Sequence, residues 1–169
     1  VIIRRRTNLE GLAPLPNIQT AIYDGTVDCM LAILCLEQPD VVFHLAALGN
    51  SEHSASDVDT MFQANILLGT HVLEGLRKNR RGIFVNTGSF WQHFDGSDSY
   101  QPVSLYAATK QAFEDVLAYY TQVAGVPSLT LKLFDVYGPG DTRPKLFNLL
   151  HQAQKSTVPI LLSPGKQLL

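Results

Sequence analysis

The chain has 169 residues, of which 46% are hydrophobic and 17% are charged, and its formal net charge is −2. This length is typical of one domain, and the composition favours a packed core over disorder. The small net charge excludes an electrostatic basis for binding nucleic acid or an anionic membrane, and no apolar run reaches the length of a membrane span. We therefore expect a single domain over residues 1–169, located in the cytoplasm.

The two cysteines, Cys29 and Cys35, are six residues apart, which differs from CxxC spacing and favours free thiols in a reducing compartment. The five histidines lack HxH or HExxH spacing, so no metal site is expected. The chain opens without Met on a strand-like run, and residues 163–169 have no terminating pattern. Both ends suggest a fragment of a longer protein.

Short apolar runs alternate with amphipathic stretches along the chain. Strands are predicted at residues 1–3, 18–23, 41–46, 82–87 and 129–134, with a last one at 158–162. Helices are predicted at 27–34 with Asp24 or Thr26 as N-cap, at 58–73, at 104–123, and from Pro144 after a sharp turn at 138–141. Residues 41–46 are expected to be fully buried. The alternation predicts an α/β fold with a Rossmann-like, doubly wound parallel sheet.

A basic run, Arg4-Arg5-Arg6, follows the first strand, where a dinucleotide fold meets the adenosine ribose. An acidic residue there binds the 2′-hydroxyl of NAD, whereas an arginine fork matches the 2′-phosphate of NADP. No acidic residue occurs until Glu10. A solvated basic loop is the alternative, but in this setting the run favours NADP.

Tyr106 and Lys110 are four residues apart on a predicted helix, so they lie one turn apart on one face. A nearby ammonium group stabilises a phenolate, which suits Tyr106 to donate or accept a proton near neutral pH. Lys110 could also donate to ribose hydroxyls. The YxxxK spacing also arises by chance on surface helices, so the pair needs further support.

Ser89 gives that support, because it follows a predicted strand and lies 17 residues before Tyr106. A hydroxyl there can hydrogen-bond a substrate carbonyl and stabilise the developing oxyanion, although a turn or cap serine is the alternative. His44 ends the most apolar strand and is either a core histidine or a neighbour of a flat cofactor. Asn65 interrupts an apolar helical stripe, and if buried it should bond the backbone of a neighbouring strand.

In their order and spacing, these residues resemble the extended short-chain dehydrogenases, also called the NAD(P)-dependent epimerase/dehydratase family. The shared pattern consists of His44-Leu45-Ala46-Ala47, Asn65, Ser89, Tyr106-x-x-x-Lys110 and Val136-Tyr137-Gly138-Pro139-Gly140-Asp141. Within the family, residues 86–93 and 105–113 are similar to the CDP-abequose and CDP-paratose synthases, which reduce the 4-keto group of a CDP-linked deoxyhexulose with NADPH. The resemblance spans nearly the whole chain.

The resemblance implies a role for each matching residue. Tyr106 would be the catalytic acid/base, Lys110 would hold the nicotinamide ribose, and Ser89 would bind the sugar carbonyl. The cofactor-binding set would be Arg4, Arg5, Asp24, Gly25, Leu45, Ala46, Ala47, Asn65, Thr87, Lys110, Phe134 and Val136. The sugar-binding set would be Asn50, Ser51, Phe90, Trp91, Gln92 and His93.

Two departures from the family pattern bear on function. The family's first strand and GxxGxxG loop, which holds the pyrophosphate at a helix N-terminus, have no match because they belong before Val1. The segments that complete the sugar-nucleotide pocket belong beyond the last residue. The fragment by itself is therefore expected to be inactive. The loop between Ser89 and Tyr106 is also short for the family.

These observations predict an NADP-dependent enzyme, with NAD as the alternative cofactor, that reduces a keto group of a nucleotide-linked sugar. An NAD-retaining 4-epimerase is the first alternative. A dehydratase is less favoured, because Phe90-Trp91 stand where family dehydratases carry an Asp-Glu pair. A non-catalytic dinucleotide-binding protein is a further alternative, against which the intact catalytic set argues. By resemblance, the complete protein would be a homodimer formed through the helices around Asn65 and Lys110.

Overall fold

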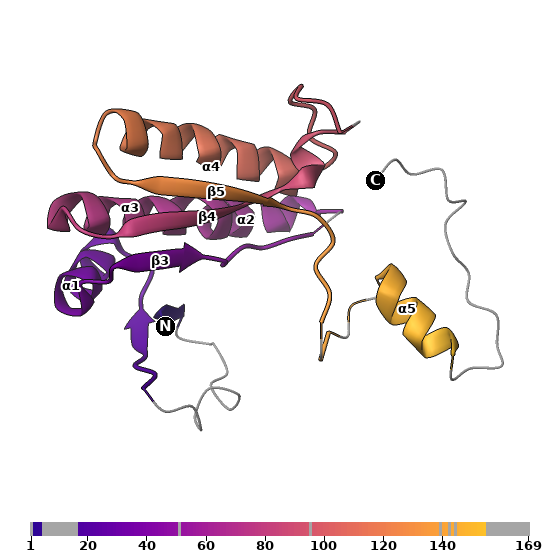
Figure 1. Cartoon of the computed structure of the whole chain (residues 1–169), viewed down its shortest axis with the longest axis horizontal. Helices are drawn as coiled ribbons and strands as arrows, with labels where there is room; N and C mark the ends of the chain where they lie inside the picture. Colours follow the sequence, from indigo (N-terminus) through magenta and orange to yellow (C-terminus); the bar gives the residue numbers. More distant parts are fainter. Residues whose placement is uncertain are drawn as a thin grey trace.

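The computed structural model describes residues 2–4, 17–50, 52–94, 96–138, 140–141, 143 and 145–154, with the backbone alone for residues 2–4. In these residues, five strands alternate with helices along the chain (Figure 1). No helix in this part of the chain is long and apolar enough to cross a membrane. The strand predicted at 158–162 lies outside the described residues.

The described strands form two parallel sheets. β1 (Ile2–Arg4) pairs with β2 (Ala21–Tyr23), and the larger sheet has the order β3 (Val41–His44), β4 (Ile83–Ser89), β5 (Ser128–Leu133). In its register His44 lies opposite Asn86, and Ser89 lies opposite Leu133. A doubly wound sheet has the strand order 3-2-1-4-5-6. The described strands instead pair in two separate groups, and because all of them are parallel the predicted α/β class is confirmed.

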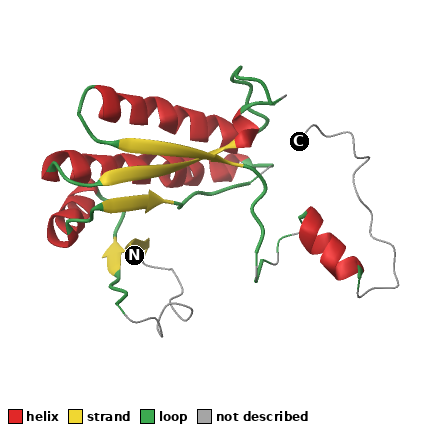
Figure 2. Ribbon diagram, viewed as in Figure 1, coloured by secondary structure: helices red, strands yellow, loops and turns green. Residues whose placement is uncertain are grey.

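The helices lie on one face of the larger sheet (Figure 2). α1 (Val27–Glu37) packs on α3 (Leu68–Asn79), which in turn contacts α4 (Leu105–Gln122), and α4 packs against β4. α5 (Leu146–Ala153) lies apart from this layer, beyond the end of β5 (Figure 1). On the sheet, Phe43, Leu129 and Leu131 are 65%, 55% and 44% exposed. The face without helices is therefore apolar.

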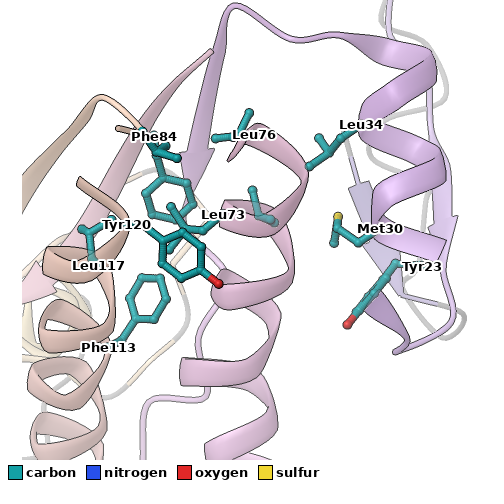
Figure 3. Close-up of a cluster of buried hydrophobic side chains, with 11 residues drawn as sticks. Tyr23, Met30, Leu34, Leu73, Leu76, Phe84, Phe113, Leu117 and Tyr120 are labelled. Atoms are coloured by element: carbon teal, nitrogen blue, oxygen red, sulfur yellow. The ribbon is translucent and has the colours of Figure 1, made fainter. Parts of the chain in front are cut away.

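The hydrophobic core fills the space between the sheet and the helix layer (Figure 3). Phe84 of β4 is fully buried together with Leu73 of α3 and Phe113 of α4. α1 joins the core through Leu34, which is 1% exposed and packs on α3 at Gly75. Each of these large side chains contributes about 1.5–3 kcal/mol by leaving water. This core fixes α4 against β4, which places the catalytic candidates.

The helix predicted at 58–73 is present, but it is not regular. A 3₁₀ turn at Ala55–Asp57 and α2 (Val58–Phe62) lead into a π-helical turn at Gln63–Leu67, after which α3 continues to Asn79. Such π turns inside α-helices are frequent at functional sites. Asn65 lies within this one, so the irregular turn decides where the Asn65 side chain points.

The prediction that residues 41–46 form a fully buried strand was wrong. β3 ends at His44, and Val41 is 43% exposed, while only His44 is fully buried in this strand. An apolar run predicts two covered faces. In the described residues helices cover only one face, and the outer edge of β3 has no neighbouring strand.

The predicted helix ends are mostly confirmed, with small shifts. Thr26 is the N-cap of α1, and its hydroxyl accepts from the Cys29 amide at 3.2 Å. The turn at 138–141 is present, with the Asp141 amide donating to the Gly138 carbonyl at 3.2 Å. α5 begins at Leu146 rather than at Pro144, which lies outside the described residues.

Candidate active site

Ser89, Tyr106 and Lys110 come together where β4 meets the first turns of α4. Ser89 is the last residue of β4, two residues beyond the predicted strand end. Ser104 caps α4 by accepting from the Ala107 amide at 3.2 Å, which sets Tyr106 in the first turn and Lys110 one turn later. Ligands of open parallel sheets bind beyond the carboxyl ends of the strands. The three residues therefore lie at the expected edge.

Burial raises the pKa of Tyr106, and the Ser89 side chain lies close enough to the Tyr106 hydroxyl to oppose that rise by lowering the pKa of that tyrosine. Gly49 lies beside the tyrosine ring, since a Cβ at this glycine would be 3.7 Å from Tyr106 Cε2. The two hydroxyls are thus close enough to act on one substrate oxygen.

Lys110 is a buried cation that is 2% exposed. Burial lowers the pKa of Lys110 to about 8, and the charge of Glu114 opposes this fall. The ammonium form therefore predominates at neutral pH. The sequence predicted that this charge lowers the pKa of Tyr106. The pKa of Tyr106 is instead raised, because burial of the phenol is the largest effect on it.

His44 lies in the core, as one of the two sequence alternatives proposed. Its ring lies 5.5 Å from the Phe84 ring and 5.3 Å from the Phe113 ring, measured between centroids. Burial, with the nearby charge of Lys110, lowers the pKa of His44 to about 4. His44 is therefore neutral at pH 7. In the described residues no three His, Cys, Asp or Glu side chains group as metal ligands.

Asn65 joins the loop after β3 to α4. Its Oδ1 accepts from the Leu48 amide at 2.7 Å, and its Nδ2 donates to the Leu48 carbonyl at 3.1 Å and to Thr109 Oγ1 at 2.9 Å. Thr109 Oγ1 in turn donates to the Tyr106 carbonyl at 2.8 Å. The sequence predicted a bond to the backbone of a strand. The backbone partner lies instead in the loop beyond β3, because the π turn aims Asn65 past the strand end.

The cofactor-binding candidates after β3 lie in an open loop. Leu45 is 68% exposed, and Ala46 and Ala47 are also exposed. Leu45 and Ala46 line a cavity of about 860 Å³ that extends to residues 17–19 before β2. Thr87 Oγ1 donates to the His44 carbonyl at 2.9 Å and so holds the loop start. Small side chains beside a cavity of this size fit part of a dinucleotide.

The remaining cofactor candidates are spread over several elements. Gly25, with a φ of +103°, and Asp24 form the turn before α1, where the Asp24 carboxylate accepts from the Thr26 amide at 2.8 Å. Arg4 ends β1, and Arg5 lies outside the described residues. Phe134 and Val136 follow β5 and are 64% and 50% exposed. None of these contacts the Ser89–Tyr106 pair through an interaction in the described residues.

The sugar-binding candidates divide into exposed and buried residues. Phe90 stacks on Phe134 with ring centroids 4.3 Å apart. A candidate for binding the sugar, Phe90, is thus in contact with a candidate for binding the cofactor, Phe134. Trp91 is 42% exposed, and Asn50 is partly exposed. Ser51 lies outside the described residues. His93 is partly exposed and its Nε2 lies 2.7 Å from Lys132 Nζ.

Gln92 differs from the other sugar-binding candidates, because it is 0% exposed and turned toward α4. Its Nε2 donates to Gln111 Oε1 at 2.8 Å and to Glu114 Oε1 at 3.0 Å. The sequence prediction did not include Glu114. A usable signal was its spacing, since a residue four positions after Lys110 shares its helix face.

Comparisons with known proteins agree with this geometry. Residues 2–168 match the model of the NAD dependent epimerase/dehydratase family. The chain is 28% identical to a CDP-abequose synthase of Yersinia pseudotuberculosis over 145 residues, which cover 86% of the chain and 49% of that protein. It is 30% identical to the uncharacterized UDP-glucose epimerase YtcB of Bacillus subtilis, and the match covers 95% of this chain and 52% of that protein. The chain thus spans about half the length of these relatives.

Solved structures show the same fold. The UDP-glucuronic acid 4-epimerase of Bacillus cereus, in complex with UDP-glucuronic acid and NAD, matches with a TM-score of 0.74 at 22% identity, covering 87% of this chain and 49% of that one. The UDP-glucose 4-epimerase of Thermus thermophilus, in complex with NAD, matches with a TM-score of 0.69 at 24% identity, covering 82% and 48%. The fold is Rossmann-like, and the chain belongs to the NAD dependent epimerase/dehydratase family of nucleotide-sugar-modifying enzymes.

Proposed function

We propose that this chain carries the catalytic residues of an NADP-dependent reductase that acts on a keto group of a nucleotide-linked deoxysugar. The observation that carries the proposal is the placement of Ser89 at the end of β4 beside Tyr106 in the first turn of α4, with the buried Lys110 one turn further along the helix. Because the chain spans about half of its relatives, the activity is proposed for a protein in which the family's phosphate-binding loop and sugar-nucleotide segments accompany it.

Each of the three side chains has one task in the proposed reaction. The Tyr106 hydroxyl donates a proton to the keto oxygen as the oxygen gains negative charge. The Ser89 hydroxyl donates a hydrogen bond to the same oxygen. The Lys110 ammonium stabilises the resulting phenolate and offers N–H donors to a ribose. A bound nicotinamide supplies the hydride for the ring carbon.

The cavity beside β3 and the exposed alanines after it are where we place the dinucleotide. Leu45, Ala46 and Ala47 would line it, and Phe134 and Val136 would approach it from the end of β5. The choice of NADP rests on Arg4, which ends β1, and on Arg5, which follows it in the sequence. Since the family is NAD-dependent and related structures hold NAD, NAD is the alternative cofactor.

The second candidate function is an NAD-retaining 4-epimerase, which the similarity to two 4-epimerase structures favours. Such an enzyme returns the hydride to the sugar, so tightly bound NAD would survive its purification. A reductase would instead be purified without dinucleotide and would consume NADPH stoichiometrically with the CDP-linked 4-keto sugar. Cofactor content and NADPH oxidation therefore separate the two candidates.

Tyr106→Phe is the first test of the mechanism in the protein that contains this chain. Loss of the proton donor should lower kcat by roughly 10²- to 10⁴-fold, while the Kd for NADPH stays unchanged. Tyr119→Phe is the matched control, because Tyr119 lies on the same helix and is 54% exposed. Equal turnover of the Tyr106→Phe variant and the unchanged protein would refute the mechanism and favour a non-catalytic dinucleotide-binding role.

A further inference from the structure

We propose that Gln92 and Glu114 are positioning residues, which together fix the backbone at Ser89 and provide the counter-charge of Lys110. The proposal rests on the function proposed above, and it assigns Gln92 to the catalytic machinery rather than to sugar recognition. Neither residue reaches substrate in this arrangement. They act through Ser89 and Lys110.

The side chain of Gln92 closes the turn that carries Ser89. This turn is a 3₁₀ helix at Phe90–Gln92, with Ser89 as its N-cap. The Ser89 amide donates to Gln92 Oε1 at 2.7 Å, and the Trp91 amide donates to Ser89 Oγ at 3.3 Å. The reciprocal bonds satisfy the first donors of the turn. A free turn would let the Ser89 hydroxyl move away from Tyr106.

Glu114 holds the other end of the Gln92 amide. Gln92 Nε2 donates to Glu114 Oε1 at 3.0 Å, and Glu114 Oε2 lies 3.5 Å from Lys132 Nζ on β5. The carboxylate fits there because residue 88 is glycine, since a Cβ at Gly88 would be 2.6 Å from Glu114 Oε1. Gln92 is fully buried, so its amide has no water to replace these partners. The bonds therefore fix one orientation of the amide.

The same carboxylate faces Lys110 electrostatically. Glu114 lies one turn after Lys110 on α4, and its charge raises the pKa of Lys110 against the larger effect of burial. The imidazole of His44 on β3, which is neutral at pH 7, also interacts with Lys110. A second cation, Lys132 on β5, lies 3.5 Å from the Glu114 carboxylate. Among the described residues, Glu114 is the anion whose charge opposes the effect of burial on Lys110.

The decisive experiment is an NMR titration of the lysine side chains in the ¹³C-lysine-labelled chain, with the Lys110 signal assigned from Lys110→Met. Glu114→Gln should move the Lys110 titration to lower pH than its value of about 8. Asp115→Asn is the matched control, because it removes the same charge from the next residue of α4, which is exposed. An unchanged Lys110 titration in Glu114→Gln, or an equal shift in Asp115→Asn, would overturn the proposal.

A second measurement tests the Gln92 half and serves if Glu114→Gln does not fold. In Gln92→Met the Ser89 amide loses its acceptor, so its hydrogen exchange should become on the order of tenfold faster. Gln111→Met is the control, because Gln111 bonds Gln92 but not Ser89. Exchange at the unchanged rate in Gln92→Met would refute this half.

Both measurements need neither cofactor nor turnover, so their outcome is independent of the proposed reaction. In an active protein, Glu114→Gln should also move the alkaline limb of the kcat/KM profile to lower pH, while the KM for dinucleotide stays constant. A merely structural residue would lower kcat at every pH without moving that limb.

Discussion

Two basic side chains, His44 and Lys110, are buried side by side and differ in charge at neutral pH. His44 is neutral because burial and the Lys110 charge both lower its pKa, to about 4. Lys110 keeps its proton because its pKa, although lowered by burial, stays at about 8. The difference follows from their ordinary pKa values and from Glu114. One of the pair can therefore pack against two phenylalanines while the other stays a cation beside Tyr106.

The pKa of His44 predicts an acid-sensitive fold. Because the folded pKa of about 4 lies below the ordinary value of 6.5, the unfolded chain binds more protons between these pH values. Stability is fully present above pH 6.5 and falls as the pH drops toward 4, by about 3 kcal/mol. Urea unfolding of the chain at several pH values measures this loss.

His44→Leu removes the titrating group, so most of the acid sensitivity in that window should disappear. The same change at His53, whose side chain is exposed, should leave the pH dependence as it is. His71 contributes in the same direction, because burial lowers its pKa too, which leaves a residual slope in His44→Leu. A His44→Leu variant with the full slope of the unchanged chain would contradict the assignment.

At the scale of helices and strands, the sequence predicted the positions of those elements that are set by the spacing of hydrophobic residues. β3, β4, β5, α1 and α4 occur where apolar runs and cap residues placed them, and the Ser89–Tyr106 pairing follows from their order. The π turn around Asn65 was not predictable, because one wider turn of the helix leaves the apolar spacing almost intact. The exposure of β3 was also missed, since an apolar run does not tell whether both sheet faces are covered.

The buried contacts of Gln92 and Glu114 were equally beyond the sequence pattern. Gln92 and Glu114 are 22 positions apart in the sequence and meet only in the folded chain. Their contact also needs Gly88, because a Cβ at this position would occupy the place of the Glu114 carboxylate. Long-range polar partners of this kind follow from tertiary packing. Residue spacing within one helix, such as that of Tyr106 and Lys110, is visible without it.

The contact between α1 and α3 gives a test at this scale. Gly75→Ala would gain about 1 kcal/mol of helix propensity, but its Cβ would lie 2.3 Å from Leu34 Cδ1 and 3.1 Å from Leu34 Cβ. A rotamer change cannot move Leu34 Cβ, so overpacking should dominate, with a net loss of about 1–2 kcal/mol in urea unfolding. Combined with Leu34→Ala, the loss should be smaller than the sum of the single losses. Additive or stabilising values would contradict the close approach.

At the scale of the molecule, the described residues form two separate parallel sheets, and helices cover one face of the larger sheet. Residues of β2 and β3 line the cavity of about 860 Å³, so it lies between the two sheets. Exposed apolar side chains on β3 and β5 mark the uncovered face. The curated relatives are about twice as long as this chain. The catalytic candidates are thus held together at the end of β4 and the start of α4, while the cavity proposed for the cofactor lies at β2 and β3.

The helix face opposite the sheet supports the last prediction, that the protein pairs with a second copy through the helices around Asn65 and Lys110. Phe62 and Leu67, which flank Asn65, are 46% and 44% exposed, and Tyr119 on α4 is 54% exposed. Burying such side chains against a symmetric partner would release apolar surface from water on both copies. Light scattering of the protein should therefore give a dimer, and Leu67→Arg should give a monomer. Leu36→Arg, at an 81% exposed position on α1, which is not one of these helices, should stay dimeric. A monomer in the unchanged protein, or equal dissociation by both variants, would place the interface elsewhere or remove it, and the catalytic residues of one chain would then act alone.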